Sequence, residues 1–138
     1  MKIILLLIIC VIAAVMDMIT LKVNNLLILT GFFAGLGCSF LDGGMHSLVI
    51  SLTGACIPIL ILMIPFILRL FGAGDIKLLS VIGVFMGPED VFYTMFYAFL
   101  AGALIVIVRY IINLNSRKDD RIPFALPVLI GVVMITGG

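Results

Sequence analysis

Two aspartates stand at the edges of long apolar runs, Asp17 at the end of the first run and Asp75 at the start of a later one. An ionisable group within a membrane segment costs about 2.5–3.5 kcal/mol on insertion scales, so such a group usually serves a function or is paired. Two carboxylates that share a site cannot readily both ionise, so the pair offers one general base and one general acid. Such a pair can activate water and protonate an amide leaving group.

Glycines surround the second acid in the stretch Phe71-Gly72-Ala73-Gly74-Asp75-Ile76-Lys77. Gly72 and Gly74 remove side-chain bulk and permit backbone angles closed to other residues, so another extended chain could lie directly against this loop. Asp75 is also expected in the positive field of the following helix's first turn, which favours its ionised form. A structural interpretation stays open for either acid alone, with Asp75 as a helix cap and Asp17 as a solvated boundary residue.

The composition is that of a membrane protein, because 64% of the 138 residues are apolar and only 11% are charged. The basic residues form no cluster of the kind that nucleic-acid binding needs, so that class is excluded. Cys10, Cys38 and Cys56 stand alone among apolar residues and are interpreted as packing residues. His46 beside Asp42 falls far short of a metal site, so we predict neither a metal nor a cofactor.

Apolar runs bounded by charged residues, glycine or proline divide the chain into about six segments: 1–16, 25–41, 47–70, 76–87, 91–112 and 122–137. A spanning helix needs about 20 apolar residues. We therefore predict one all-α integral membrane domain over residues 1–138, with about six transmembrane helices. The fourth segment would cover only about 18 Å, so its ends must face protein or a watery cavity. This predicts a catalytic cleft at Asp75.

The distribution of basic residues predicts the orientation. If all six segments cross, the connections 17–24, 69–75 and 113–121 share one side of the membrane, and both acids lie there. Lys2 is the one base expected on the opposite side. The bases on or next to the first side are Lys22, Arg69, Lys77, Arg109, Arg117, Lys118 and Arg121. This excess marks the first side as cytoplasmic, so the cleft is predicted to open to the cytoplasmic face of the cell membrane.

The two acidic motifs together resemble those of the prepilin peptidases, membrane aspartic proteases with a Gly-x-Gly-Asp motif. The resemblance is to the short form associated with tight-adherence (Flp-type) and archaeal-type pilins. Residues 72–79 match the family's second motif. Residues 122–127 resemble its closing segment. The first motif is matched by Asp17, Lys22, Val23 and Asn25, with Asn24 in place of the usual proline.

This resemblance implies an aspartic endopeptidase that cleaves the leader of type IV prepilin-like precursors at the cytoplasmic membrane face. It implies Asp17 and Asp75 as the catalytic residues. The residues that it implies in substrate binding or loop shaping are Gly72, Gly74, Lys77, Asn25 and Pro127. The expected partners are a prepilin-like precursor and the lipid bilayer, while the particular precursor and the oligomeric state stay open.

Many bacterial relatives in that family carry an extra cytoplasmic domain with paired C-x-x-C sites and also N-methylate their product. The connection 17–24 is too short to hold such a domain. We therefore predict peptidase activity without that zinc site, and leave methylation open.

Two other classes of function are kept as alternatives. The same acids could relay protons in a small proton-coupled carrier or channel. A relay needs acceptors distributed through the depth of the membrane, whereas Asp17 and Asp75 are predicted at one boundary. A catalytically silent assembly subunit is the third interpretation.

Overall fold

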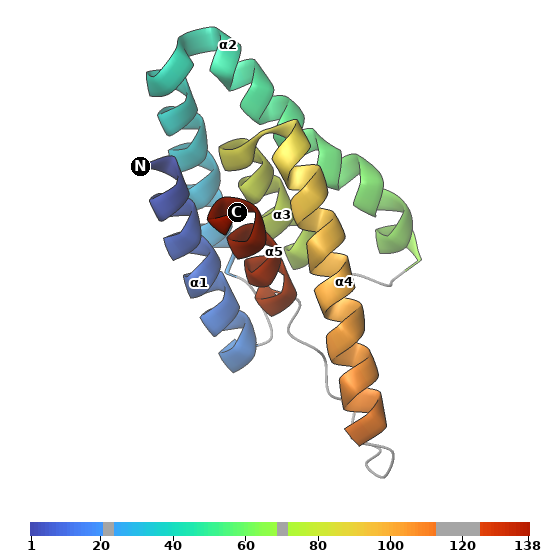
Figure 1. Ribbon diagram of the computed structural model, residues 1–138. Coiled ribbons are helices and arrows are strands. Elements are labelled where there is room, and N and C mark those ends of the chain that lie inside the picture. The colour runs from blue at the N-terminus through green and yellow to red at the C-terminus, as the bar shows by residue number, and fades with distance from the viewer. Residues whose placement is uncertain (21–23, 69–71, 113–124) are drawn as a thin grey trace.

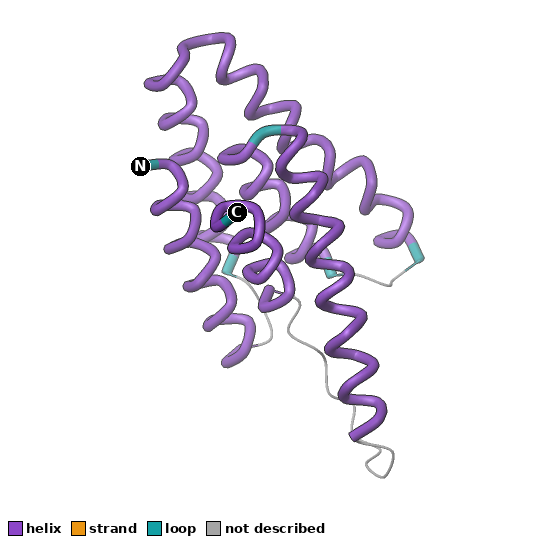
Figure 2. Tube along the Cα trace, in the orientation of Figure 1, coloured by secondary structure: helices purple, strands orange, loops and turns teal. Residues whose placement is uncertain are grey.

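The computed structural model describes residues 1–20, 24–68, 72–112 and 125–138, and within these ranges the regular structure is entirely helical (Figures 1 and 2). The helices are α1 (Lys2–Thr20), α2 (Asn25–Ile67), α3 (Ala73–Met86), α4 (Pro88–Ile112) and α5 (Ala125–Gly137). This confirms the all-α prediction for the described residues.

α2 is two helical segments joined by a sharp bend, which Figure 1 shows at the top of the bundle. The backbone leaves helical geometry at Gly43 and Gly44, and Gly44 has φ +60°. Glycine adopts that conformation without the penalty that a side chain would add. The bend falls within 42–46, where the sequence predicted a connection between two segments.

Three of the described helices are long and apolar enough to cross a membrane: α1, α2 and α4. α3 has 14 residues and would cover about 21 Å at the helical rise, less than the roughly 30 Å of hydrocarbon in a bilayer. The lengths and apolar composition of these helices therefore support the prediction that the chain is a membrane protein. The count of six crossings and the cleft on the cytoplasmic side stay predictions.

α3 occupies the centre of the bundle, between α2 and α4 in Figure 1. Every residue from Leu78 to Phe85 is buried, so the helix is covered on all sides. It packs most extensively against α2 and also contacts α1, α4 and α5. A short helix that is buried all round must be held by its neighbours, as the sequence predicted for the fourth segment.

Close contact between α2 and α3 depends on two glycines. A methyl group on Gly54 would strike the backbone carbonyl of Gly83, and a methyl group on Gly83 would strike that of Gly54. Earlier in α2, a methyl group on Gly35 would lie 2.8 Å from the side chain of Val84 in α3. Small residues at such positions let helix backbones approach closely in membrane proteins.

We expect Gly83→Ala to destabilise the bundle, because the added methyl group has no space between α2 and α3. Overpacking of this kind costs about 1–3 kcal/mol. Thermal unfolding of the detergent-solubilised protein should show a lower Tm. Gly37→Ala is the matched control, since Gly37 lies in α2 with no atom within 4 Å of an added methyl group. An equal loss of Tm in both variants would contradict this packing role.

Candidate active site

Asp17 lies in the last turn of α1 and points into the protein, with only 7% of its surface exposed. The sequence placed it in the connection 17–24, but α1 continues to Thr20. Asp17 therefore extends the buried face of α1 that includes Cys10, Ala13 and Ala14. Its Oδ2 atom accepts a hydrogen bond of 3.0 Å from the backbone N–H of Ala125, the first residue of α5.

Asp75 is the third residue of α3, and Gly72 is the residue that caps this helix. The Asp75 carboxylate accepts a hydrogen bond of 3.3 Å from the backbone N–H of Gly72, so it caps its own helix. The sequence indicated that these glycines permit backbone angles closed to other residues. Gly72 is extended at φ −79° and Gly74 is helical, so neither glycine uses that freedom. What the glycines supply is small size.

The two acids act on each other electrostatically. Asp75 lies outside the three helices that are long enough to span a membrane. Burial raises the pKa of Asp75 to about 6; the Gly72 N–H opposes this shift, and the negative charge of Asp17 adds to it. A like charge has this effect only when it lies close by. The fold therefore brings α1 and the start of α3 together at one end of the bundle.

Two more of the predicted site residues meet at the same end. The ammonium group of Lys77 donates a hydrogen bond of 3.1 Å to the Oδ1 atom of Asn25. Lys77 lies on α3 two residues after Asp75, and Asn25 is the first residue of α2. Asn24 caps α2, because its side chain accepts a hydrogen bond of 3.1 Å from the N–H of Leu26. Asparagine in place of the usual proline thus gives α2 a defined start.

Pro127 lies buried in the first turn of α5, where proline is tolerated because those N–H groups lack helical partners. The sequence singled out Pro127 and its segment, but it gave no signal for Ala125, which donates to Asp17. A backbone N–H is common to all residues except proline, so residue type could not reveal this donor. Residues 122–124 and Lys22 lie outside the described residues.

We expect Asn25 and Lys77 to be energetically coupled, because the ammonium–amide bond joins the start of α2 to the first turns of α3. A hydrogen bond to a charged group in an exposed position contributes about 1 kcal/mol. A double-mutant cycle of Asn25→Ala and Lys77→Met, followed by thermal unfolding, should give a coupling energy of that size. Strictly additive effects of the two substitutions would contradict the contact.

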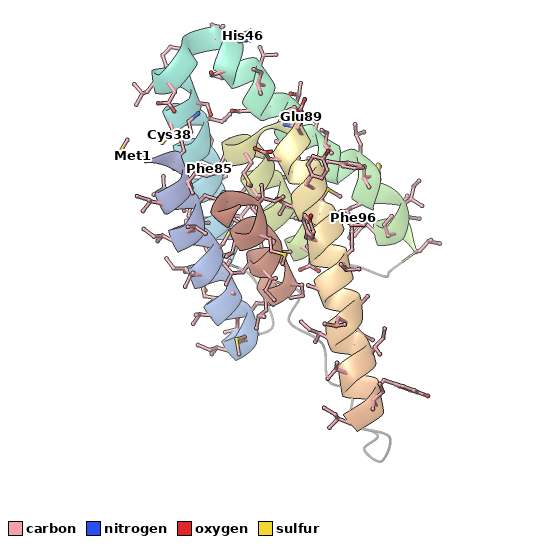
Figure 3. The ribbon with its side chains drawn as sticks, in the orientation of Figure 1. Met1, Cys38, His46, Phe85, Glu89 and Phe96 are labelled. Atoms are coloured by element: carbon pink, nitrogen blue, oxygen red, sulfur yellow. The ribbon has the colours of Figure 1, made fainter. Side chains whose placement is uncertain are left out.

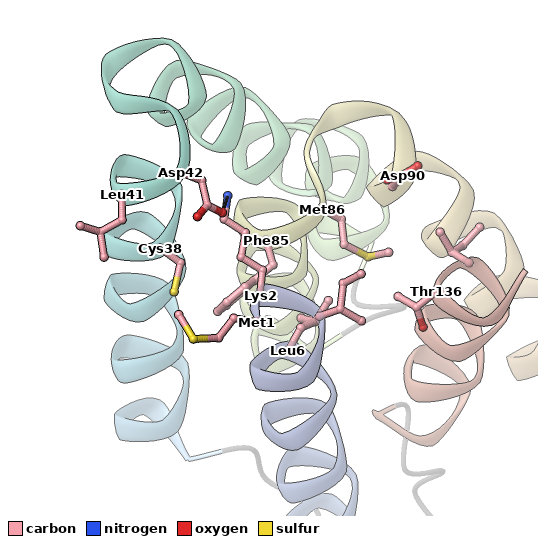
Figure 4. Close-up of a pocket in the computed structure, with 12 residues that line it drawn as sticks. Met1, Lys2, Leu6, Cys38, Leu41, Asp42, Phe85, Met86, Asp90 and Thr136 are labelled. Carbon is pink, nitrogen blue, oxygen red and sulfur yellow. Dashed lines mark ion pairs between the residues drawn. The ribbon is translucent and has the colours of Figure 1, made fainter.

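Polar groups also gather at the opposite end of the bundle. Lys2 forms an ion pair of 3.1 Å with Asp42 and donates a hydrogen bond to Ser39. A cavity of about 470 Å³ opens there, lined by Lys2, Phe85, Asp90 and Thr136 among others (Figure 4). His46 is exposed near the bend of α2 (Figure 3). The described ranges contain no group of three or more side chains able to hold a metal ion.

The apolar helices are those of a membrane protein, and two carboxylates held by backbone donors lie together at one end of the bundle. The profile of the type IV leader peptidase family matches residues 4–107, which include both acids and stop before α5. Since this match covers more than half of the chain, the chain belongs to the type IV leader peptidase family. No curated protein and no solved structure matches it.

Family membership confirms the resemblance drawn from the two acidic motifs. It implies a protease that processes pilin-like precursors, and it does not favour the proton-carrier alternative.

Proposed function

We propose that the protein is an aspartic endopeptidase that removes the leader of type IV prepilin-like precursors, with Asp17 and Asp75 as its catalytic pair. One observation carries this proposal. Two acids far apart in the sequence lie near enough at one end of the bundle for the charge of Asp17 to raise the pKa of Asp75. Carboxyl groups whose pKa is shifted and that lie beside a second acid are typical of catalytic sites.

The reaction needs one ionised and one protonated carboxyl group. The ionised group takes a proton from a water molecule as its oxygen attacks the carbonyl carbon of the scissile peptide bond. The protonated group gives its proton to the leaving nitrogen, and the C–N bond breaks. The products are the carboxyl end of the leader and the free amine of the shortened precursor. The proton gained by one acid balances the proton lost by the other, so the pair still holds one proton, which must return to the first acid before the next cycle.

Open space beside Asp75 supports the approach of a substrate chain. Within the described residues, a methyl group added to Gly74 would meet no atom within 4 Å beyond its own neighbours in α3. Gly74 is therefore not needed for packing, unlike Gly54 or Gly83. Glycine in a helix interior is destabilising by roughly 0.5–1 kcal/mol relative to alanine, so its presence calls for another reason. We infer that an extended segment of the precursor lies against α3 at this point.

The site is proposed to face the cytoplasm. The basic residues of the sequence concentrate on the side of the membrane where Asp17 and Asp75 lie. A precursor whose leader is still in the cytoplasm would reach the pair from that side. The proposed chemistry uses only the carboxyl groups and water, so it requires no cofactor.

Replacing either acid should abolish cleavage. Asp17→Asn and Asp75→Asn each remove a proton acceptor or donor, and loss of general acid–base catalysis costs about 10²–10⁴-fold in rate. The measurement is leader removal from a co-expressed precursor that carries a basic leader before an apolar helix, followed by mass spectrometry. Glu89→Gln, in the first turn of α4 at the opposite end of the bundle, is the matched control. Normal cleavage by both Asp variants would reject the proposed function.

Gly74→Ala should show whether Gly74 serves the approach of the substrate or the packing of the protein. The methyl group enters space that we assign to the substrate, so KM for the same precursor should rise about tenfold, the effect of roughly 1.4 kcal/mol. The Tm should stay the same or increase, because alanine favours the helix. Gly37→Ala, at a helical glycine that likewise has no atom of the described residues near an added methyl group, should leave KM unchanged. A fall in Tm without a rise in KM would show that Gly74 serves packing instead.

A further inference from the structure

The cavity at the end of the bundle opposite Asp17 and Asp75 is lined by residues from all five described helices (Figure 4). Its volume of about 470 Å³ lies within the range of about 300–1,000 Å³ that is usual for small-molecule sites. Lys2, which lines it, and Asp17 lie near opposite ends of α1, about 22 Å apart at the helical rise. The cavity is therefore separate from the proposed active site, and a role for it does not depend on the proposed function.

An ammonium group is held in place on one side of this cavity. Lys2 forms an ion pair of 3.1 Å with Asp42 and donates a hydrogen bond of 3.3 Å to the Oγ atom of Ser39. Ser39 is fully buried and accepts a second hydrogen bond, of 2.6 Å, from Ser51 on the other side of the bend in α2. An ammonium group has three N–H donors, so Lys2 has one donor for a ligand beyond these two contacts.

A carboxylate lies on the other side of the cavity. Asp90, in the first turn of α4, lies across the cavity from Lys2 and Asp42 in Figure 4. Among the described residues, Lys2 and Asp42 form the ion pair, and Asp90 has no basic partner within ion-pair distance. Glu89 shares the first turn of α4 but does not line the cavity. The charged side chains around the cavity are thus one base and two acids, and one acid lacks a counter-charge.

The buried part of the lining is apolar. Leu6 and Phe85 line the cavity, with 0% and 9% of their surfaces exposed. The cavity lies where α1 and α4 begin, and both helices are long and apolar enough to cross a membrane. The ends of spanning helices lie at the level of the lipid head groups. Pockets between such helices bind head groups where their charges are complementary.

We propose that this cavity binds the head group of phosphatidylethanolamine. The primary amine of the lipid pairs with Asp90, and its phosphate accepts the remaining N–H of Lys2. The first carbons of an acyl chain lie against Leu6 and Phe85. The amine is required, because a head group with a phosphate alone would bring a negative charge to a site that already has one in excess.

Competition between two lipids tests the amine contact. Phosphatidylethanolamine and phosphatidylglycerol with the same acyl chains share the phosphate, and the first alone has an amine. Purified wild-type protein in detergent with an equimolar mixture should retain more phosphatidylethanolamine, counted by native mass spectrometry. Asp90→Asn should lower its retention about threefold, the order of a partly exposed ion pair, without weakening phosphatidylglycerol. Glu89→Gln is the matched control and should behave as the wild type.

The phosphate contact is tested at Lys2. Lys2→Met should weaken the retention of both lipids, because both present a phosphate. Lys2→Arg keeps the positive charge and should restore retention. Lipid that merely surrounds the helices would respond to neither Lys2 variant and would overturn the proposal.

Thermal unfolding supplies a second measurement, because a ligand that binds only the folded protein raises its Tm by mass action. Phosphatidylethanolamine should raise the Tm of the wild type and of Glu89→Gln more than phosphatidylglycerol does, and Asp90→Asn should lose this difference. Each variant without added lipid is its own reference, so a variant of lower stability remains informative. Equal effects of the two lipids on the wild type would overturn the proposal. Retention that depends on Lys2 but not on Asp90 would indicate an anionic ligand and would overturn it as well.

Discussion

A carboxylate among apolar helices must obtain from protein groups the hydrogen bonds that water would otherwise supply. Burying a charge without such partners costs several kcal/mol, so the position of an acid in a membrane protein dictates where backbone donors must lie. Asp17 accepts a hydrogen bond from the first N–H of α5, and Asp75 accepts one from the N–H of the residue that precedes α3. This requirement ties α1, α3 and α5 together at one end of the bundle, and the rest of the fold has to be compatible with it.

The central position of α3 follows from the same constraint. A short helix can lie within the bundle because its neighbours cover it, and Gly54 and Gly83 let α2 come close enough to do so. At its far end, Gly87 at φ +87° turns the chain directly into Pro88, the first residue of α4. α3 is thereby fixed at both ends and along its length. This rigidity suits the role that we propose for Asp75, because acid–base catalysis depends on where the proton donor and acceptor are held.

Hydrophobic patterning predicted the helices well, since each predicted apolar segment is helical over most of the residues that the structure describes. The ends were less accurate: α1 runs on to include Asp17, and Pro88–Asp90 belong to α4, not to a connection. The two glycines before Asp75 left the backbone conformation open, because a permissive residue can equally adopt ordinary helical geometry, as Gly74 does. The contacts of Asn25 with Lys77 and of Asp17 with Ala125 are tertiary and join positions 52 and 108 residues apart. Local sequence cannot specify such pairs, and the second involves no side chain of Ala125.

The Asp17–Ala125 bond also sets an order of events during synthesis. Asp17 enters the membrane region with α1, yet its backbone partner follows 108 residues later along the chain. At a translation rate of about 5–20 residues per second, the nascent aspartate spends seconds without that donor. A ribosome-bound intermediate that has inserted α1 to α4 therefore contains both acids, but its Asp17 still lacks the hydrogen-bond donor from α5. The arrival of α5 completes the hydrogen bonding of Asp17, so the protease that we propose becomes competent only after α5 has joined the bundle.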